Sequence, residues 1–80
     1  MALKDRLAET FREALELSGD IDIPGLKYQA ISEWNSIGHM QLVAAMEGTF
    51  DIMLDTDEII DMSSFAKALE LLGKHGVADD

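Results

Sequence analysis

Apolar side chains at helical spacing constrain this chain more than any other feature of its sequence. At the amino end they recur every four positions, with charged residues between them: Leu3, Leu7, Phe11 and Leu15. This spacing predicts an amphipathic helix of about four turns. The helix is expected to end at Ser18-Gly19-Asp20. Its apolar stripe must then be buried against segments that come later in the chain.

A second helix is expected to begin at Asn35 or Ser36, ahead of a strongly apolar segment. Asn is among the best N-cap residues, because its side-chain oxygen accepts from N–H groups of the first turn. The inner face of this helix would hold Ile37, Met40, Val43, Ala44 and Met46, widened by Leu42 and Phe50. Such a broad stripe predicts the most buried helix of the chain, with Gly48 loosening its end.

The segment between these two helices reads as a long ordered loop. It runs from Asp20 to Trp34 and contains Pro24, Gly25 and isolated apolar residues: Ile21, Ile23, Leu26, Tyr28 and Ile31. We expect these single side chains to attach the loop to the core. Structureless loops of this length are uncommon in small domains and are often functional.

Two further helices are expected in the last third of the chain. Apolar residues alternate from Phe50 to Leu54, which we interpret as an extended connection because no second strand-like segment could pair with it. Thr56 is the expected cap of a short helix through Ile59 and Ile60. Ser63 or Ser64 would cap the last helix, Gly73 would close it and the tail to Asp80 would fray; its inner face would hold Phe65, Ala68, Leu69 and Leu72.

These elements predict an all-α domain, a small four-helix bundle with three longer helices and one short helix. Residues 1–80 would form a single domain with its core at about 3–74. The chain has no cysteine, which excludes disulfides, a thiolate metal site and a thiol of its own. Because we find neither a signal peptide nor an apolar run of about 20 residues, we expect a cytoplasmic protein without a membrane span. We also expect a monomer.

The formal net charge of −10 comes from 16 acidic and 6 basic residues. This balance argues against nucleic acid as a partner, because the phosphates would be repelled. It suits protein partners with basic docking patches, where opposite potentials accelerate and orient short encounters. The charge is also compatible with a simple role in solubility.

Ser36 is the residue that most resembles a site of chemistry. It stands at the break between the loop and the apolar helix, where the helix dipole favours a phosphate. The alternative is that Ser36 merely caps the helix, although Asn35 is able to do so itself. As a nucleophile it would need a base, and His39 lies one turn on; however, there is no Gly-x-Ser-x-Gly motif, and we expect His39 to be a solvated helix residue.

The acidic residues and the methionines form two other patterns that could indicate a site. The acids from Asp55 onward fail the spacing of a calcium loop, because Ile59 and Ile60 occupy its fifth and sixth positions. No metal site is therefore expected. Four internal methionines are interpreted as adaptable core filler: Met40, Met46, Met53 and Met62. A hypothesis that goes further is that such a core repacks around an inserted aliphatic chain.

The order and spacing of these residues resemble the acyl carrier proteins. The likeness extends over about residues 3–74 and is carried by the runs Trp34-Asn35-Ser36-Ile37-Gly38-His39-Met40, Leu42-Val43-Ala44-Ala45-Met46-Glu47, Phe50-x-Ile52-x-Leu54, Asp57-Glu58-Ile59, Met62-Ser63 and Ala68-Leu69-x-Leu71-Leu72. The family's Asp-Ser-Leu motif is short, but here the later landmarks stand in register with it.

The resemblance implies a carrier that is not itself an enzyme. Ser36 would be esterified to 4'-phosphopantetheine by a separate magnesium-dependent phosphopantetheinyl transferase that uses coenzyme A. The thiol at the end of this arm would hold acyl or aminoacyl groups as thioesters. Loading ligases and acyl-transfer or condensing enzymes would be the other partners. An imported thiol is consistent with the absence of cysteine.

Two departures from the family pattern bear on function. Asn35 stands where the family usually has aspartate, which keeps the cap but removes a charge that helps the transferase engage. Acids are also scarce on the second helix and gather later in the chain: Asp51, Asp55, Asp57, Glu58 and Asp61. We interpret the chain as a specialised carrier rather than the general carrier of fatty acid biosynthesis. The alternative, favoured by Asn35, is a helical interaction module that never receives an arm.

Partner docking is expected around Ser36. The docking candidates comprise apolar and polar residues of the second helix and acids of the third: Ile37, Met40, Gln41, Glu47, Asp57 and Glu58.

Overall fold

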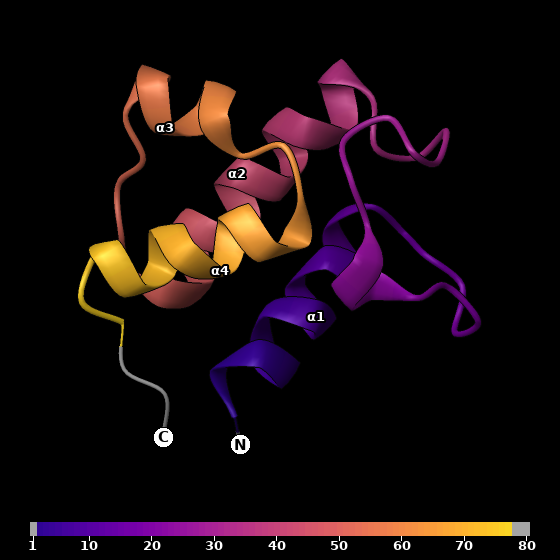
Figure 1. Ribbon diagram of the computed structural model, residues 1–80, viewed down its shortest axis with the longest axis horizontal. Helices are drawn as coiled ribbons and strands as arrows, with labels where there is room; N and C mark the ends of the chain where they lie inside the picture. The colour runs from indigo at the N-terminus through magenta and orange to yellow at the C-terminus, as the bar shows by residue number, and fades with distance from the viewer. Residues whose placement is uncertain (1, 78–80) are drawn as a thin grey trace.

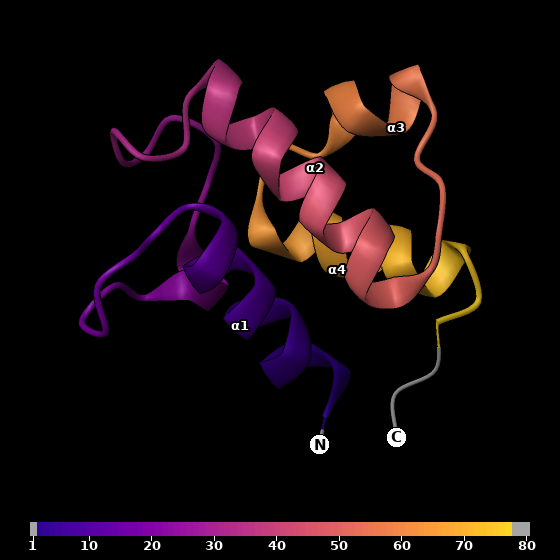
Figure 2. The ribbon, with the colours of Figure 1, turned by 180° about the vertical axis from the view of Figure 1, so that it is seen from behind.

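The computed structural model describes residues 2–77. Within them the chain forms four α-helices and one short 3₁₀ helix, η1: α1 Leu3–Ala14, η1 Ile23–Gly25, α2 Ser36–Phe50, α3 Thr56–Asp61 and α4 Phe65–Lys74. The described residues contain no strand, only one isolated bridge. The prediction of an all-α domain with three longer helices and one short helix is confirmed. Figures 1 and 2 show α1 and α4 against α2, with the short α3 beside α2.

The core lies between α1, α2 and α4 and includes the long loop. Three aromatic side chains meet at its centre: the rings of Phe11 and Trp34 are 5.2 Å apart, and those of Phe11 and Phe65 are 5.1 Å apart. Their edge-to-face packing contributes beyond the burial of their area. The predicted apolar stripe of α1 is fully buried, and in α4 Ala68 and Leu72 are buried while Leu69 is half-buried.

The burial of α2 corrects the prediction for its inner face. Its buried residues are Gly38, Leu42, Val43, Met46 and Phe50. All of them except Val43 follow a spacing of four positions. Ile37, Met40 and Ala44 point to solvent instead. α2 is as buried as α1 rather than more so, since 5 of its 15 residues are buried and 4 of 12 in α1. The segment is apolar on both sides, so apolar content could not tell which side faces the core.

The first helix ends earlier than Ser18, at Ala14. Glu16 adopts a left-handed conformation with φ 53°, and the N–H of Leu17 donates to the carbonyl of Arg12 over 2.9 Å. These are the marks of a Schellman motif, in which an apolar residue just past the helix packs back onto it. Leu17 is indeed buried.

The last helix continues past Gly73, which therefore does not close it. α4 extends to Lys74, and Gly76 adopts the left-handed conformation with φ 79°. The N–H of Val77 donates to the carbonyl of Leu72 over 2.9 Å, so the same type of motif ends α4. The predicted fraying of the tail lies outside the described residues, beyond Val77.

The caps of α3 and α4 depend on side chains just before each helix. Asp55, not Thr56, caps α3: its carboxylate accepts from the N–H of Glu58 over 2.8 Å, and Glu58 accepts in return from the N–H of Asp55. This reciprocal pair is a capping box. Ser64 caps α4 as predicted, accepting from the N–H of Lys67 over 3.1 Å. The segment before α3 forms no strand, as expected, but Phe50 still belongs to α2 and Asp51 adopts the left-handed conformation with φ 54°.

The long loop is ordered and attached to the core at single side chains, as predicted. Ile23 and Leu26 are buried, while Ile21, Tyr28 and Ile31 are half-buried. A short antiparallel bridge joins the loop to the residues before α4. In it the N–H of Tyr28 donates to Ser63 over 2.8 Å, and the N–H of Phe65 donates to Leu26 over 3.0 Å. The ring of Tyr28 also lies 6.1 Å from that of Trp34, just before the start of α2. None of the helices in residues 2–77 is long and apolar enough to cross a membrane.

Candidate functional site

Asn35 caps α2, as predicted. Its side-chain oxygen accepts from the N–H of Gly38 over 2.8 Å, and its side-chain nitrogen donates to the carbonyl of Ser32 over 3.2 Å. The amide therefore ties the loop to the first turn of the helix. Because the Asn35 side chain makes the capping bond to the N–H of Gly38, Ser36 is not needed as a cap.

Ser36 is the first residue of α2 and is exposed. Its hydroxyl oxygen lies 3.2 Å from the hydroxyl oxygen of Tyr28, which comes from the loop. The helix dipole places partial positive charge at this end of α2, which favours an anionic substituent. The arrangement leaves an accessible hydroxyl at a helix amino end.

A hydrogen-bonded chain begins at Trp34, two residues before this serine. The indole N–H of Trp34, a fully buried residue, donates to Nδ1 of His39 over 2.9 Å. Nε2 of His39 then donates to the carbonyl of Ile59 over 2.8 Å. Since Nδ1 must accept and Nε2 must donate, the ring carries its proton on Nε2. The chain connects the residue before the cap of α2 to α3.

His39 is thus not the solvated residue that was predicted. It is half-buried, stacks on Trp34 with ring centroids 6.1 Å apart and packs edge-on against Tyr28 at 5.1 Å. Both of its nitrogens are bonded to groups other than Ser36. The serine and histidine therefore do not form the hydrogen-bonded pair that an activated nucleophile needs. Sequence reasoning missed this role; the signal was the Trp34–His39 spacing across the start of a helix.

An apolar groove with a volume of about 260 Å³ lies beside the serine. It runs between the loop, α2 and α3 and is lined by Tyr28, His39, Ile59, Ile60, Met62 and Ser63. Tyr28 belongs both to the groove and to the contact with Ser36. In the candidate site Tyr28 therefore links an exposed hydroxyl to a largely apolar depression.

Four of the predicted docking residues are accessible. Ile37 and Met40 are 72% and 55% exposed. Gln41 on α2 and Asp57 on α3 are exposed as well.

The other two predicted docking residues are engaged inside the domain. The Glu47 carboxylate accepts from the N–H of Leu54 over 2.9 Å and so holds the connection after α2. Glu58 is only 6% exposed. Its prediction as a docking residue is wrong, because its carboxylate serves the capping box and meets α4.

The Glu58 carboxylate joins α3 to the end of α4. Both of its oxygens lie 2.9 Å from Nε2 of His75, and Nζ of Lys74 is 3.6 Å from one of them. The N–H of Asp55, above all, holds the pKa of Glu58 below its usual value of 4.5, and the bond to His75 adds to this effect. Glu58 is therefore a structural acid.

The methionines divide into two groups. Met46 and Met62 are fully buried, which confirms them as core filler. Met40 and Met53 are 55% and 81% exposed, so the same interpretation is wrong for them. Met62 also lines the groove beside the serine.

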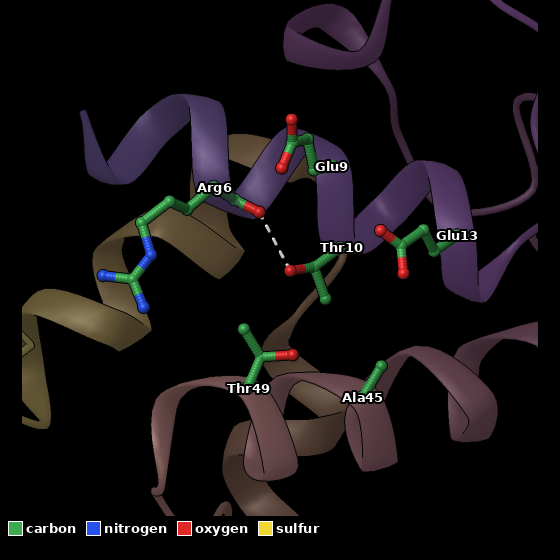
Figure 3. A pocket seen from close by; sticks show the side chains of 6 residues that line it. All are labelled: Arg6, Glu9, Thr10, Glu13, Ala45 and Thr49. Carbon is green, nitrogen blue, oxygen red and sulfur yellow. Dashed lines mark hydrogen bonds between the residues drawn. The ribbon is translucent and has the colours of Figure 1, made fainter. Parts of the chain in front are cut away.

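A second depression lies on the other side of α2 and does not involve Ser36. Figure 3 shows it between α1 and α2, with Arg6, Glu9, Thr10 and Glu13 on one wall and Ala45 and Thr49 on the other. Its volume is about 160 Å³. The hydroxyl of Thr10 donates to the carbonyl of Arg6 over 2.9 Å and is thereby satisfied within α1.

The part of the chain that the structure describes contains no group of three or more His, Cys, Asp or Glu side chains able to hold a metal ion.

No protein-family model matches the chain, and no curated protein or solved structure is significantly similar to it.

Proposed function

We propose that the chain is an acyl carrier that bears a 4'-phosphopantetheine arm on Ser36 and presents acyl or aminoacyl thioesters to partner enzymes. The observation that carries the proposal is that Asn35 and Ser36 have separate roles at the start of α2. Asn35 makes the capping bond, so the exposed hydroxyl of Ser36 remains available for modification. The resemblance to acyl carrier proteins supports the same residue.

The surroundings of Ser36 fit a phosphodiester. The group would carry a negative charge at the amino end of a helix, where the dipole favours it. The arm would supply a thiol, which this cysteine-free chain lacks. In the attachment step the Ser36 hydroxyl loses its proton and forms the ester with phosphopantetheine, while adenosine 3',5'-bisphosphate leaves from coenzyme A.

The absence of a Ser36–His39 pair is compatible with this role. A carrier needs no activated nucleophile, because the transferase supplies the base and the magnesium ion. His39 instead holds α2 and α3 together through Trp34 and Ile59. The groove beside Ser36 offers apolar surface close to where the arm would begin. Loading ligases and acyl-transfer or condensing enzymes would then act on the protein that bears the arm.

The test is intact-protein mass spectrometry after incubation with a broad-specificity phosphopantetheinyl transferase, magnesium and coenzyme A. We expect a mass gain of one phosphopantetheine in the native chain. The Ser36→Ala variant should show none, which assigns the arm to this residue. A gain that persists in Ser36→Ala would refute the assignment.

A second candidate function follows from the neutral side chain of Asn35. A helical interaction module with the same fold would receive no arm. The Asn35→Asp variant separates the possibilities, because it restores the charge and keeps the cap. Modification of Asn35→Asp alone would indicate a mismatched transferase or a retired site. Failure of both the native chain and Asn35→Asp would favour the interaction module.

A further inference from the structure

The hydroxyl of Tyr28 is the side-chain group that the loop places against Ser36. The two hydroxyl oxygens are 3.2 Å apart, and either of them can be the donor. Tyr28 stands eight residues before Ser36, so the contact depends on how the loop folds back onto the start of α2. A hydrogen bond between two neutral hydroxyls at the surface adds little to folding, because water offers both groups the same bonds.

The backbone of the loop fixes the position of this phenol. The N–H of Tyr28 donates to the carbonyl of Ser63 over 2.8 Å, and the N–H of Gln29 donates to the carbonyl of Trp34 over 3.0 Å. Gln29 has a φ of 67°, a conformation that non-glycine residues adopt only where their surroundings hold them. The main chain is thereby tied down at Tyr28 and again two residues before Ser36.

Two aromatic neighbours hold the ring of Tyr28 as well. It meets Trp34 edge-on at 6.1 Å between ring centroids and His39 at 5.1 Å. His39 has both of its ring nitrogens in hydrogen bonds to other groups, so it has no donor left for a substituent on Ser36. The phenol O–H, in contrast, already lies beside the serine and can donate.

A phosphodiester on Ser36 would give this phenol a stronger acceptor than the serine hydroxyl. The charge of the group would reside on its two non-bridging oxygens, which lie one atom further out than the serine oxygen. Hydrogen bonds to an ionised acceptor are roughly twice as strong as those between neutral groups. Tyr28 also lines the apolar groove, so a group that it binds is held at the side of Ser36 where the groove lies.

We propose that Tyr28 is a positioning residue for the arm, whose hydroxyl donates to a non-bridging oxygen of the phosphodiester on Ser36. The proposal rests on the proposed function for the identity of the group on Ser36. The helix dipole attracts negative charge in general, whereas a single donor from the loop fixes its orientation. Tyr28→Phe keeps the ring against Trp34 and His39 and removes only this donor.

The experiment is NMR spectroscopy of the chain before and after attachment of the arm, with the tyrosine ring labelled by ¹³C at Cζ. The chain has one tyrosine, so the labelled carbon gives a single signal. We expect this signal to move downfield on attachment, because donation to a charged oxygen draws the phenol toward phenolate character. The ³¹P signal of the arm should differ between the native chain and Tyr28→Phe. Attachment should raise the Tm of the native chain by at least about 2 °C more than that of Tyr28→Phe.

The matched control is Ser32→Ala. It removes an exposed hydroxyl four residues before Ser36 and leaves the phenol in place. Its ³¹P signal and its gain in Tm should equal those of the native chain. Circular dichroism checks that Tyr28→Phe keeps its helices. If Tyr28→Phe does not fold, the ¹³C shift of the native chain decides the question by itself.

The Ser36→phosphoserine chain separates this proposal from the arm. Phosphoserine incorporated during translation presents charged oxygens at the same position without a transferase, and we expect it to move the ¹³C signal of Tyr28 in the same direction. If this shift occurs in a chain that gains no mass with coenzyme A, the arm is refuted and Tyr28 stands as a donor to a phosphate on Ser36. A ¹³C signal that stays in place in both modified chains would overturn the proposal. Equal ³¹P signals and Tm gains in the native chain and Tyr28→Phe would overturn it as well.

Discussion

The indole N–H of Trp34 donates to Nδ1 of His39 over 2.9 Å, across the turn where the loop becomes α2. Trp34 is fully buried, so this bond satisfies a polar group that has no access to water. The same imidazole donates to the carbonyl of Ile59, so α3 is held to the start of α2. Ser36 lies between Trp34 and His39 in sequence, and it is exposed where they are buried and half-buried.

Removing the imidazole should destabilise the domain. His39→Ala leaves the Trp34 N–H without its acceptor and the Ile59 carbonyl without its donor, so we expect the free energy of unfolding to fall by about 2 kcal/mol. Urea denaturation followed by tryptophan fluorescence measures this change. Gln41→Ala, an exposed change in the same helix, should stay within about 0.5 kcal/mol. An equal effect of the two variants would mean that water replaces His39.

The two residues at the start of α2 should differ in their contribution to stability. Asn35→Ala removes the bond to the N–H of Gly38 and should lower the free energy of unfolding by about 1 kcal/mol. Ser36→Ala should change it by less than about 0.5 kcal/mol, because Ser36 is not the cap. Thermal unfolding of both variants makes the comparison. A larger loss of unfolding free energy in Ser36→Ala than in Asn35→Ala would contradict the assignment of the cap to Asn35.

Two glycines of α2 should respond oppositely to alanine. A Cβ on Gly38 would collide with the carbonyl oxygen of Glu33 and lie 3.0 Å from Cδ2 of Leu15, so Gly38→Ala should destabilise by about 1–3 kcal/mol. Gly48 has nothing within 4 Å of such a Cβ. Gly48→Ala should therefore stabilise by about 0.5–1 kcal/mol, because alanine has the higher helix propensity. Denaturation curves that shift in the same direction would refute this reading of the packing.

Acid should weaken the attachment of α3 to α4 through Glu58. Its pKa is held below the usual 4.5, so folding favours the ionised form. The resulting stabilisation is fully present above pH 4.5 and is lost as the pH falls through the pKa of the folded state. Urea denaturation from about pH 6 to about pH 3 measures the free energy of unfolding of the native chain and of Glu58→Gln. The amount by which the native chain exceeds the variant should shrink as the pH falls. A constant difference between the two across this range would show that the carboxylate does not contribute through its charge.

The helical elements were predictable because their signals are local. The four-residue spacing from Leu3 to Leu15 places one face of α1 in the core, and Asn35 and Ser64 are side chains that cap helices wherever they occur. The end of α1 was misplaced because Glu16 adopts a left-handed conformation that non-glycine residues rarely take. Gly76 closes α4 because glycine adopts the left-handed conformation without a steric penalty. In the sequence alone, Gly73 has the same property and could not be told apart from it.

By itself the sequence determined that the chain is helical, where α2 and α4 begin and that an exposed hydroxyl could follow a capping Asn35. These properties depend on spacing and on neighbours within one turn. Only the tertiary structure decided which side of α2 faces the core, that His39 bonds Trp34 and Ile59, and that Glu58 is buried against His75. Each of these depends on contacts between segments distant along the chain. An apolar helix and a polar side chain permit several such arrangements, and the contacts between distant segments select one.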